Sequence, residues 1–227
     1  NELISIQNEI RHLKNLRKLY LGDNQLNGLL ESLAECLSLE KLYINKNKFE
    51  KFPKVIKDLD SLKVLIISEN PLRYLPSFIG EMKSLEYLSA DTCFLKELPN
   101  SIGNLQSLKH LYVDINQLKS IPESIGNLKS LERFALSNNE LTSLPESIGN
   151  LESLQNLYLD GNKIEKLPNS IGRLKNLKIL RVKRNNLKTI PSSISNLSKL
   201  RYRKLEGNLL ESIPESIKRL KLIHKSF

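Results

Sequence analysis

The chain has 227 residues, of which 40% are hydrophobic and 26% are charged, and its formal net charge is +10. This composition is apolar enough to bury a core, which excludes a disordered chain, and no apolar run reaches the ~18 residues that a membrane span needs. Two cysteines are too few for a disulfide-stabilised scaffold.

A period of 23 residues runs through the whole chain. Eight of the nine prolines follow this spacing, and only Pro71 lies outside the series. Asparagine recurs with the same period and fills nine of ten positions from Asn1 to Asn208, the exception being Cys93. A unit of this length cannot bury its apolar face alone, so neighbouring units are expected to stack into a solenoid.

The unit LQNLYLDGNKIEKLPNSIGRLKN, in the second half of the chain, indicates what each position contributes. Leu157 and Leu159 alternate with polar residues, which predicts a short strand with one buried face. Asn162 follows the strand, and because its amide both donates and accepts hydrogen bonds, stacked copies should form an asparagine ladder. Pro168 suits the first position of a short convex helix, and Gly172 permits a tight bend.

These positions match LxxLxLxxN/CxL and resemble the leucine-rich repeat over the whole chain. The segment LPESIGNLESL at Leu144–Leu154 is similar to the 23-residue LPxxIxxL class, which includes secreted leptospiral, Ras-adaptor and plant intracellular Ras-group leucine-rich repeat proteins. The resemblance implies an α/β solenoid of about ten coils, a horseshoe with a concave parallel β-sheet and convex turns or short 3-10 helices. We expect a single solenoid over residues 1–227, a fragment or mature form missing its N-terminal end.

The N-terminal end carries no recognisable cap, because Asn1 already occupies a ladder position. An uncapped coil exposes backbone groups and apolar side chains, here Leu3 and Ile6. Self-association through this end is therefore a hypothesis that the sequence leaves open.

The cysteines and histidines do not predict a metal or catalytic site. Cys36 and Cys93 lie about two and a half coils apart, on the order of 12 Å at strand spacing, so we expect buried free thiols and no disulfide. His110 is placed on the concave side near Asp91 and Asp114, which admits a metal or acid–base interpretation. A solvated strand histidine is the simpler interpretation, because no third nitrogen or sulfur ligand is in reach. We expect no cofactor, no metal and no enzymatic activity.

The exposed strand positions should carry the information about binding, because packing fixes the buried ones. Six of the seven tyrosines fall in two columns of strand positions, and only Tyr74 lies elsewhere. Both β-propensity and partner binding explain this enrichment, since tyrosine is common in strands and at interfaces. The candidate partner-binding residues are Tyr20, Tyr43, Ile66, Tyr87, His110, Tyr112, Arg133, Tyr158, Arg181 and Tyr202.

Charged residues are distributed unevenly along the solenoid. Asp91, Asp114 and Asp160 follow their strands, either as solvated turn residues or as an acidic line that favours a basic partner. Residues 177–227 contain 13 Lys and Arg against 3 Asp and Glu, whereas residues 1–176 are balanced. The basic patch comprises Lys183, Arg184, Arg201 and Lys204. It is interpreted as a solubilising end or as a site for an anionic partner; nucleic acid is not expected, because no known reading element accompanies it.

Arg203 occupies a core position that holds Leu157 and Leu180 in earlier coils. An unpaired buried charge is costly, so the last strand is open to water, or Arg203 is paired, or Tyr202 turns inward. We predict the first of these, a core that frays at Arg203.

These observations predict a non-enzymatic scaffold that recognises a protein partner through its concave face. The resemblance implies a secreted bacterial protein that interacts with host molecules, and a secreted or cell-surface location is favoured over a cytoplasmic one. The alternative is the recognition module of a larger intracellular signalling adaptor or effector, whose catalytic part lies outside this chain.

Overall fold

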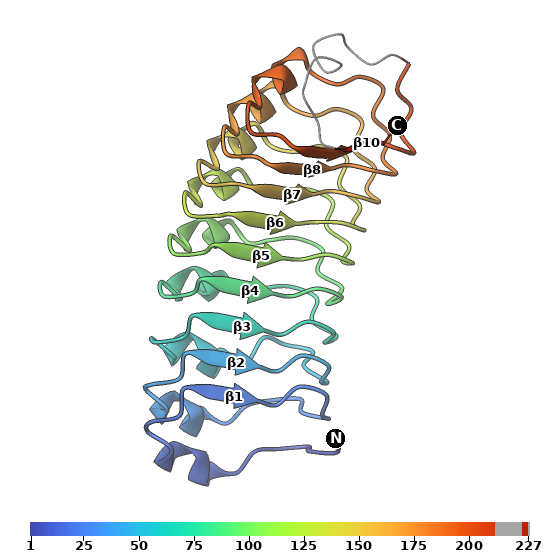
Figure 1. Ribbon diagram of the computed structural model, residues 1–227. Coiled ribbons are helices and arrows are strands. Elements are labelled where there is room, and N and C mark those ends of the chain that lie inside the picture. The colour runs from blue at the N-terminus through green and yellow to red at the C-terminus, as the bar shows by residue number, and fades with distance from the viewer. Residues whose placement is uncertain (212–223, 227) are drawn as a thin grey trace.

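The predicted solenoid is confirmed by the computed structural model, which describes residues 1–211 and the backbone of residues 224–226 (Figure 1). Ten parallel strands of the described chain form one sheet in chain order, each paired with the next. The strands are β1 (Lys18–Tyr20), β2 (Lys41–Tyr43), β3 (Val64–Ile66), β4 (Tyr87–Ser89), β5 (His110–Tyr112), β6 (Arg133–Ala135), β7 (Asn156–Tyr158), β8 (Ile179–Arg181), β9 (Tyr202–Lys204) and β10 (His224–Ser226).

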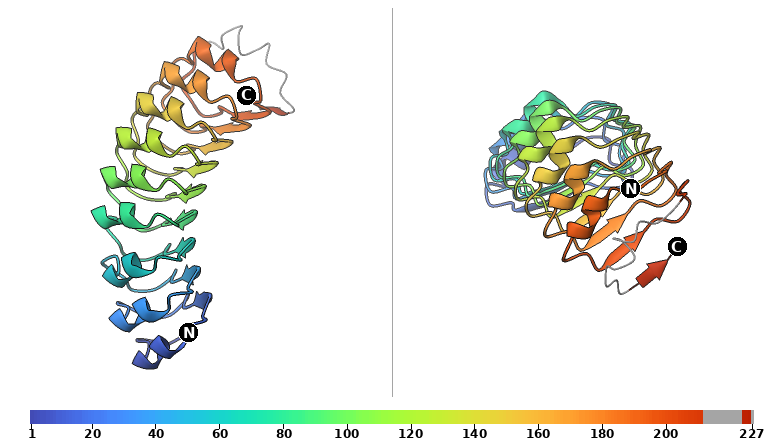
Figure 2. Two further views of the ribbon diagram at one scale, coloured as in Figure 1. Left: turned by 90° about the vertical axis from the view of Figure 1, so that its left-hand side faces the viewer. Right: turned by 90° about the horizontal axis from the view of Figure 1, so that it is seen from above.

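Short 3-10 helices line the side of the solenoid opposite the sheet, so the strands lie on the inner side of the curve and the helices on the outer side (Figure 2). In most coils a proline directly precedes the helix, where its fixed φ suits the entry of the chain. The helices of the described residues are η1 (Asn8–His12), η2 (Glu31–Glu35), η3 (Lys54–Asp58), η4 (Ser77–Glu81), η5 (Asn100–Asn104), η6 (Glu123–Asn127), η7 (Glu146–Asn150), η8 (Asn169–Arg173) and η9 (Ser192–Asn196).

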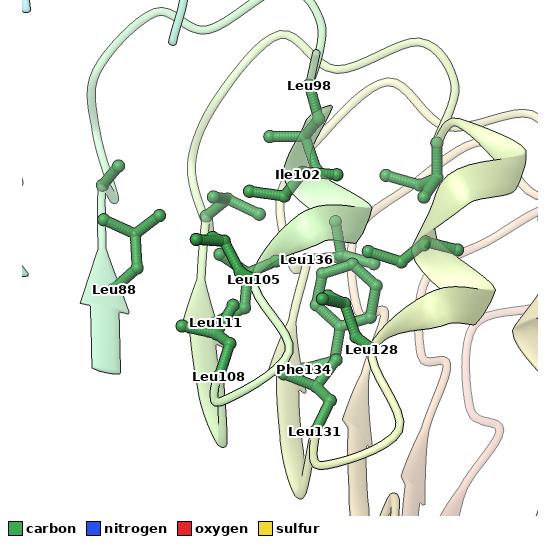
Figure 3. Packing of buried hydrophobic residues seen from close by; sticks show 14 of the residues in the cluster. Leu88, Leu98, Ile102, Leu105, Leu108, Leu111, Leu128, Leu131, Phe134 and Leu136 are labelled. Carbon is green, nitrogen blue, oxygen red and sulfur yellow. The ribbon is translucent and has the colours of Figure 1, made fainter. Parts of the chain in front are cut away.

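The register of the sheet places equivalent residues of successive coils side by side. The middle residue of β5, Leu111, pairs with Leu88 of β4 and with Phe134 of β6, and all three side chains are fully buried. Figure 3 shows how these residues meet leucines and isoleucines that follow the strand and lie in the convex segment. One continuous core therefore runs along the solenoid, and the first and third residues of each strand are left to face the concave side.

The asparagine ladder predicted from the sequence is present. Nδ2 of Asn162 donates to the carbonyl oxygens of Leu136 in the coil before and Leu159 in its own coil, and Oδ1 accepts the Leu141 N–H at 3.0 Å. The same pattern recurs at Asn47, Asn70, Asn116, Asn139 and Asn185. Each rung satisfies buried backbone groups of two coils, which is why asparagine recurs at this position.

Glycine in the convex helices serves close stacking and not the tight bend expected at Gly172. A Cβ atom on Gly172 would lie 2.3 Å from the carbonyl oxygen and 2.8 Å from the Cβ of Ser193 in the next coil. The same glycine–serine contact recurs at Gly80, Gly103, Gly126 and Gly149. Any larger residue at these positions would push the neighbouring helices apart.

The prediction that the core frays at Arg203 is wrong. Arg203 is only 3% exposed. In the sheet it stands opposite Leu180 of β8 on one side and opposite Lys225 of β10 on the other. Because β10 pairs with β9, the strand that contains Arg203 is not the edge of the sheet. Burial lowers the pKa of the Arg203 guanidinium, in keeping with a side chain removed from water.

The first coil is less well covered than those that follow it. Leu3 is 42% exposed and Ile4 is 71% exposed, whereas Ile6 is half-buried against the core. Self-association through this end stays a prediction, which light scattering over a range of concentrations would test. Among residues 1–211 and 224–226, no helix is both long and apolar enough to cross a membrane.

Candidate concave binding face

All ten candidate partner-binding residues lie at the first or third position of β1 to β9 and so share one face of the sheet. This concave face is lined by rings at its N-terminal end and centre. Tyr20 and Tyr43 stack with ring centroids 4.4 Å apart and planes 12° apart, and Tyr20 is 65% exposed. Stacked neighbours hold each other's rotamers, so the face presents apolar area that loses little side-chain entropy on binding.

A second aromatic group, in the middle of the sheet, contains Tyr87, His110 and Tyr112. The Tyr87 ring lies 5.2 Å from that of Tyr112 and 5.6 Å from that of His110. Burial, followed by the neighbouring Tyr112, raises the pKa of Tyr87 to about 12, so its hydroxyl stays protonated. Burial and the nearby Arg133 charge lower the pKa of His110, which favours a neutral ring. His110 thus belongs to an aromatic group, and within residues 1–211 and 224–226 no cluster of three or more His, Cys, Asp or Glu could hold a metal.

A hollow of about 400 Å³ lies between Tyr112 and Tyr158. Ala135 stands between these tyrosines in the third-position column, paired with Tyr112 of β5 and Tyr158 of β7, and its small side chain leaves the space open. Arg133 and Arg181 also line the hollow, and Arg133 is exposed. Asp114 and Asp160 line it as well, so the hollow combines a shallow apolar floor with both arginines and carboxylates at its rim.

The three aspartates beside the tyrosines connect successive coils. Oδ1 of Asp91 accepts the N–H of Asp114 at 2.8 Å, and Oδ1 of Asp160 accepts the N–H of Lys183 at 2.8 Å. Asp114 accepts the N–H of Ser137 in the same way. The turn interpretation is therefore the better one, with the addition that each carboxylate bridges two coils.

The carboxyl group of Asp114 is perturbed by its surroundings. Burial, opposed by hydrogen bonds from Ser137 and reinforced by the Asp91 charge, raises the pKa of Asp114 to about 6. Its charge therefore changes close to neutral pH.

The structure places the residues of the basic patch in different surroundings. Lys183 lies 3.6 Å from Glu206, and Lys204 lies 5.4 Å from the centre of the Tyr202 ring. Burial, followed by the neighbouring Lys183 charge, lowers the pKa of Lys204. Arg181, close by, forms an ion pair with Asp160. Arg184 and Arg201 are exposed, so an anionic partner would meet fewer uncompensated charges here than the composition suggests.

Sequence reasoning missed Ala135 and Ile115 because neither carries a chemical signal of its own. Ala135 indicates a hollow only when its small side chain is compared with Tyr112 and Tyr158, which occupy the same strand position in the coils on either side. Ile115 has a φ of 53° and is 55% exposed, a left-handed conformation that is strained for a β-branched side chain. The equivalent positions of the next two coils hold Asn138 and Gly161, residue types that adopt this conformation readily, and this was the available signal.

Comparisons with known families agree with this geometry. The family described as a leucine-rich repeat region matches residues 62–138, 87–161 and 125–221, and the leucine-rich repeat family matches residues 15–37. No curated protein sequence matches the chain significantly.

Solved structures with the same fold come from bacteria and plants. A leucine-rich repeat protein of Leptospira interrogans is 29% identical over 98% of this chain and 74% of that one, with a TM-score of 0.61. The ectodomain of the Arabidopsis thaliana membrane receptor kinase GASSHO1/SCHENGEN3, in complex with CASPARIAN STRIP INTEGRITY FACTOR 2, is 30% identical, with a TM-score of 0.84. This chain covers 28% of that receptor chain, and 97% of its own length is matched. Internalin C2 of Listeria monocytogenes is 24% identical to this chain, with a TM-score of 0.76. The match covers 86% of this chain and 83% of internalin C2, and it shows a similar fold alone.

Proposed function

The chain belongs to the leucine-rich repeat family, and on this premise we propose that it is a non-enzymatic scaffold that binds a protein partner on its concave face. The observation that carries the proposal is the hollow at Ala135 between Tyr112 and Tyr158. Rigid aromatic rings around a small pocket are typical of the anchor points of protein interfaces. A relative in the family, the GASSHO1/SCHENGEN3 ectodomain, was solved with a bound partner.

The chemistry of the hollow suggests what the partner inserts. An apolar or aromatic side chain would fill the space over Ala135, and a carboxylate next to it would pair with the exposed Arg133. Asp114 and Asp160 are already engaged by backbone N–H groups of the next coil, so they are less suited to attract a basic partner.

We further propose that the protein is a secreted bacterial protein that acts on host molecules. The support is the similarity to the Leptospira interrogans protein, which extends over 98% of this chain and 74% of that one. The second candidate is a recognition module within a larger signalling adaptor or effector. It is favoured by the small share of the plant receptor chain that this chain covers. The full-length gene product and its location in fractionated cells would separate the two.

Affinity capture with three matched variants tests the concave face. The wild type would be compared with a Tyr112→Ala/Tyr158→Ala double variant, with Ala135→Trp, which fills the hollow, and with Asn127→Ala, an exposed change in η6 on the convex side. Candidate host or cell extracts would be used at low and raised salt, and retained proteins would be quantified by mass spectrometry.

We expect the amount of captured partner to fall at least tenfold with the double variant and with Ala135→Trp. The amount captured by Asn127→Ala should equal that captured by the wild type. A partner that survives the tyrosine changes but leaves at raised salt would refute the concave site. It would move binding to the basic patch instead.

A further inference from the structure

Three departures from the repeat lie on one side of the solenoid. Pro71 is the proline outside its series, Tyr74 is the tyrosine outside the strand columns, and Cys93 is the break in the asparagine series. These residues and Phe94 belong to the segments that follow β3 and β4, at or just after the ladder position and before the convex helices. These three irregularities therefore share one location in the fold.

The backbone ladder that ties neighbouring coils together is interrupted at this location. In the next coils, the N–H of Gln117 donates to the carbonyl oxygen of Leu95, and equivalent bonds recur farther along. Pro71 has no N–H to offer at the equivalent position. In the described part of the chain, Phe94 makes no such bond to Leu72 either. The irregularity thus extends over two successive coils.

Cys93 removes the side-chain rung at the same point. Because cysteine offers no amide oxygen, the N–H of Leu72 bonds instead to the carbonyl oxygen of Asn70, within its own turn, at 2.8 Å. The Cys93 sulfur lies 3.5 Å from the carbonyl oxygen of Ile67, and burial raises the pKa of the thiol to about 12. As predicted, Cys36 and Cys93 are both buried free thiols.

A cavity of about 720 Å³ opens where the ladder is interrupted, and we call it the lateral groove. Pro71, Tyr74 and Phe94 supply its apolar surface, with Tyr74 51% exposed and Phe94 52% exposed. Phe94 also has a φ of 58°, a left-handed conformation that is strained for a large side chain. A strained residue that leaves about half of its ring in solvent gains little from packing, and strain of this kind is often found at binding sites.

The charged residues of the lateral groove are mostly cations. Lys51, Arg73 and Lys96 line it together with one carboxylate, Glu50. Within residues 1–211 and 224–226, none of the three cations forms an ion pair. Uncompensated cations around exposed rings are the complement of a peptide that carries both acidic and apolar side chains.

We propose that the lateral groove is a second recognition site, which binds an extended acidic segment of a protein partner. An aromatic or aliphatic side chain of that segment lies against Tyr74 and Phe94, and its carboxylates pair with Arg73 and Lys96. The site shares no residue with the hollow at Ala135, so it does not depend on the concave face.

Selection from a phage-displayed library of random 12-residue peptides tests this proposal. Enriched peptides would be synthesised with a fluorescein label, and binding to the wild type would be followed by fluorescence anisotropy. Arg73→Glu/Lys96→Glu reverses the groove charges, and Phe94→Asn removes the ring but keeps a residue that adopts positive φ. Lys166→Glu/Lys188→Glu is the matched control, because both lysines are exposed and lie outside the groove.

We expect enriched peptides to combine Asp or Glu with Phe, Tyr or Leu. Their affinity should fall at least tenfold in Arg73→Glu/Lys96→Glu and in Phe94→Asn. It should be unchanged in Lys166→Glu/Lys188→Glu and in Tyr112→Ala/Tyr158→Ala, which separates this site from the concave one. Thermal unfolding followed by circular dichroism would confirm that each variant is folded.

Two results would overturn the proposal. The first is no enrichment of acidic peptides, or peptides whose binding survives the charge reversal. The second is heparin binding that depends on Arg73 and Lys96 when no peptide binds. That result would assign the cations to a polyanionic glycan instead of a protein segment.

Discussion

Replacing Asn116 with alanine should lower the free energy of unfolding by about 4 kcal/mol, because its amide serves buried backbone groups of two coils. Oδ1 accepts the N–H of Cys93 at 3.0 Å and that of Leu95 at 2.9 Å. Nδ2 donates to the carbonyl oxygens of Ala90 and Val113 at 3.0 and 3.1 Å. A buried group that loses its partner costs about 1–3 kcal/mol, and alanine leaves at least both N–H groups without one.

Urea unfolding at pH 7, followed by far-ultraviolet circular dichroism, measures this loss. Cys93→Ala is the matched control, because Cys93 occupies the same ladder column without an amide and should cost only about 1–2 kcal/mol of packing. The dependence of the free energy on urea must stay the same in both variants, since a solenoid that unfolds in parts would invalidate the comparison. If Asn116→Ala loses no more stability than Cys93→Ala, the ladder does not hold the coils together as argued.

Three further substitutions test particular residues. Because the pKa of Asp114 is raised from 3.8 to about 6, the folded chain holds this proton more tightly than the unfolded chain. Wild-type stability should therefore fall by about 1–2 kcal/mol, after allowance for solvent screening, as the pH rises from about 4 to about 6. In Asp114→Asn, the free energy of unfolding measured with urea should depend less on pH over this range. An unchanged pH dependence would contradict the raised pKa of Asp114. Phe94→Gly should raise the unfolding free energy by about 0.5–1 kcal/mol, because glycine adopts positive φ without strain; a loss of stability would show that the ring packs. Arg203→Leu should lower the free energy of unfolding by about 1–3 kcal/mol in thermal unfolding, because the groups that the buried guanidinium contacts lose their partner; an unchanged midpoint would show that this core position does not depend on the guanidinium.

Much of the architecture could be predicted because each repeat position has one dominant physical requirement. Leu157 and Leu159 must be buried, and Asn162 must satisfy backbone groups of two coils, so their spacing is sufficient to indicate a strand followed by a ladder. Gly172 was also recognised as special, although for the wrong reason, since its space is taken by Ser193 of the next coil. Contacts within one coil follow from the sequence of that coil, whereas contacts between coils depend on the stacking distance.

The errors and omissions in the candidate site have the same origin. Arg203 was expected to be open to water because an unpaired charge in a core position is costly, yet β10 pairs with β9 and the side chain is buried. The hollow at Ala135 was not predicted, because it is made by the difference in size between Ala135 and the tyrosines of neighbouring coils. A periodic sequence indicates which positions face outward, but the shape of that face depends on how neighbouring side chains compare.

Stacking also decides which polar side chains remain available to a partner. Asp160 accepts a backbone N–H from the next coil and pairs with Arg181, so much of its hydrogen-bonding capacity is used within the solenoid. The Tyr158 hydroxyl accepts a hydrogen bond from the side chain of Asn156 at 3.2 Å, and a side-chain partner can rearrange when a ligand arrives. Mutation of one of these aspartates should therefore affect stability more than binding. Mutation of a tyrosine should affect binding more than stability. A double variant at Tyr112 and Tyr158 that unfolds at markedly lower urea would contradict this division.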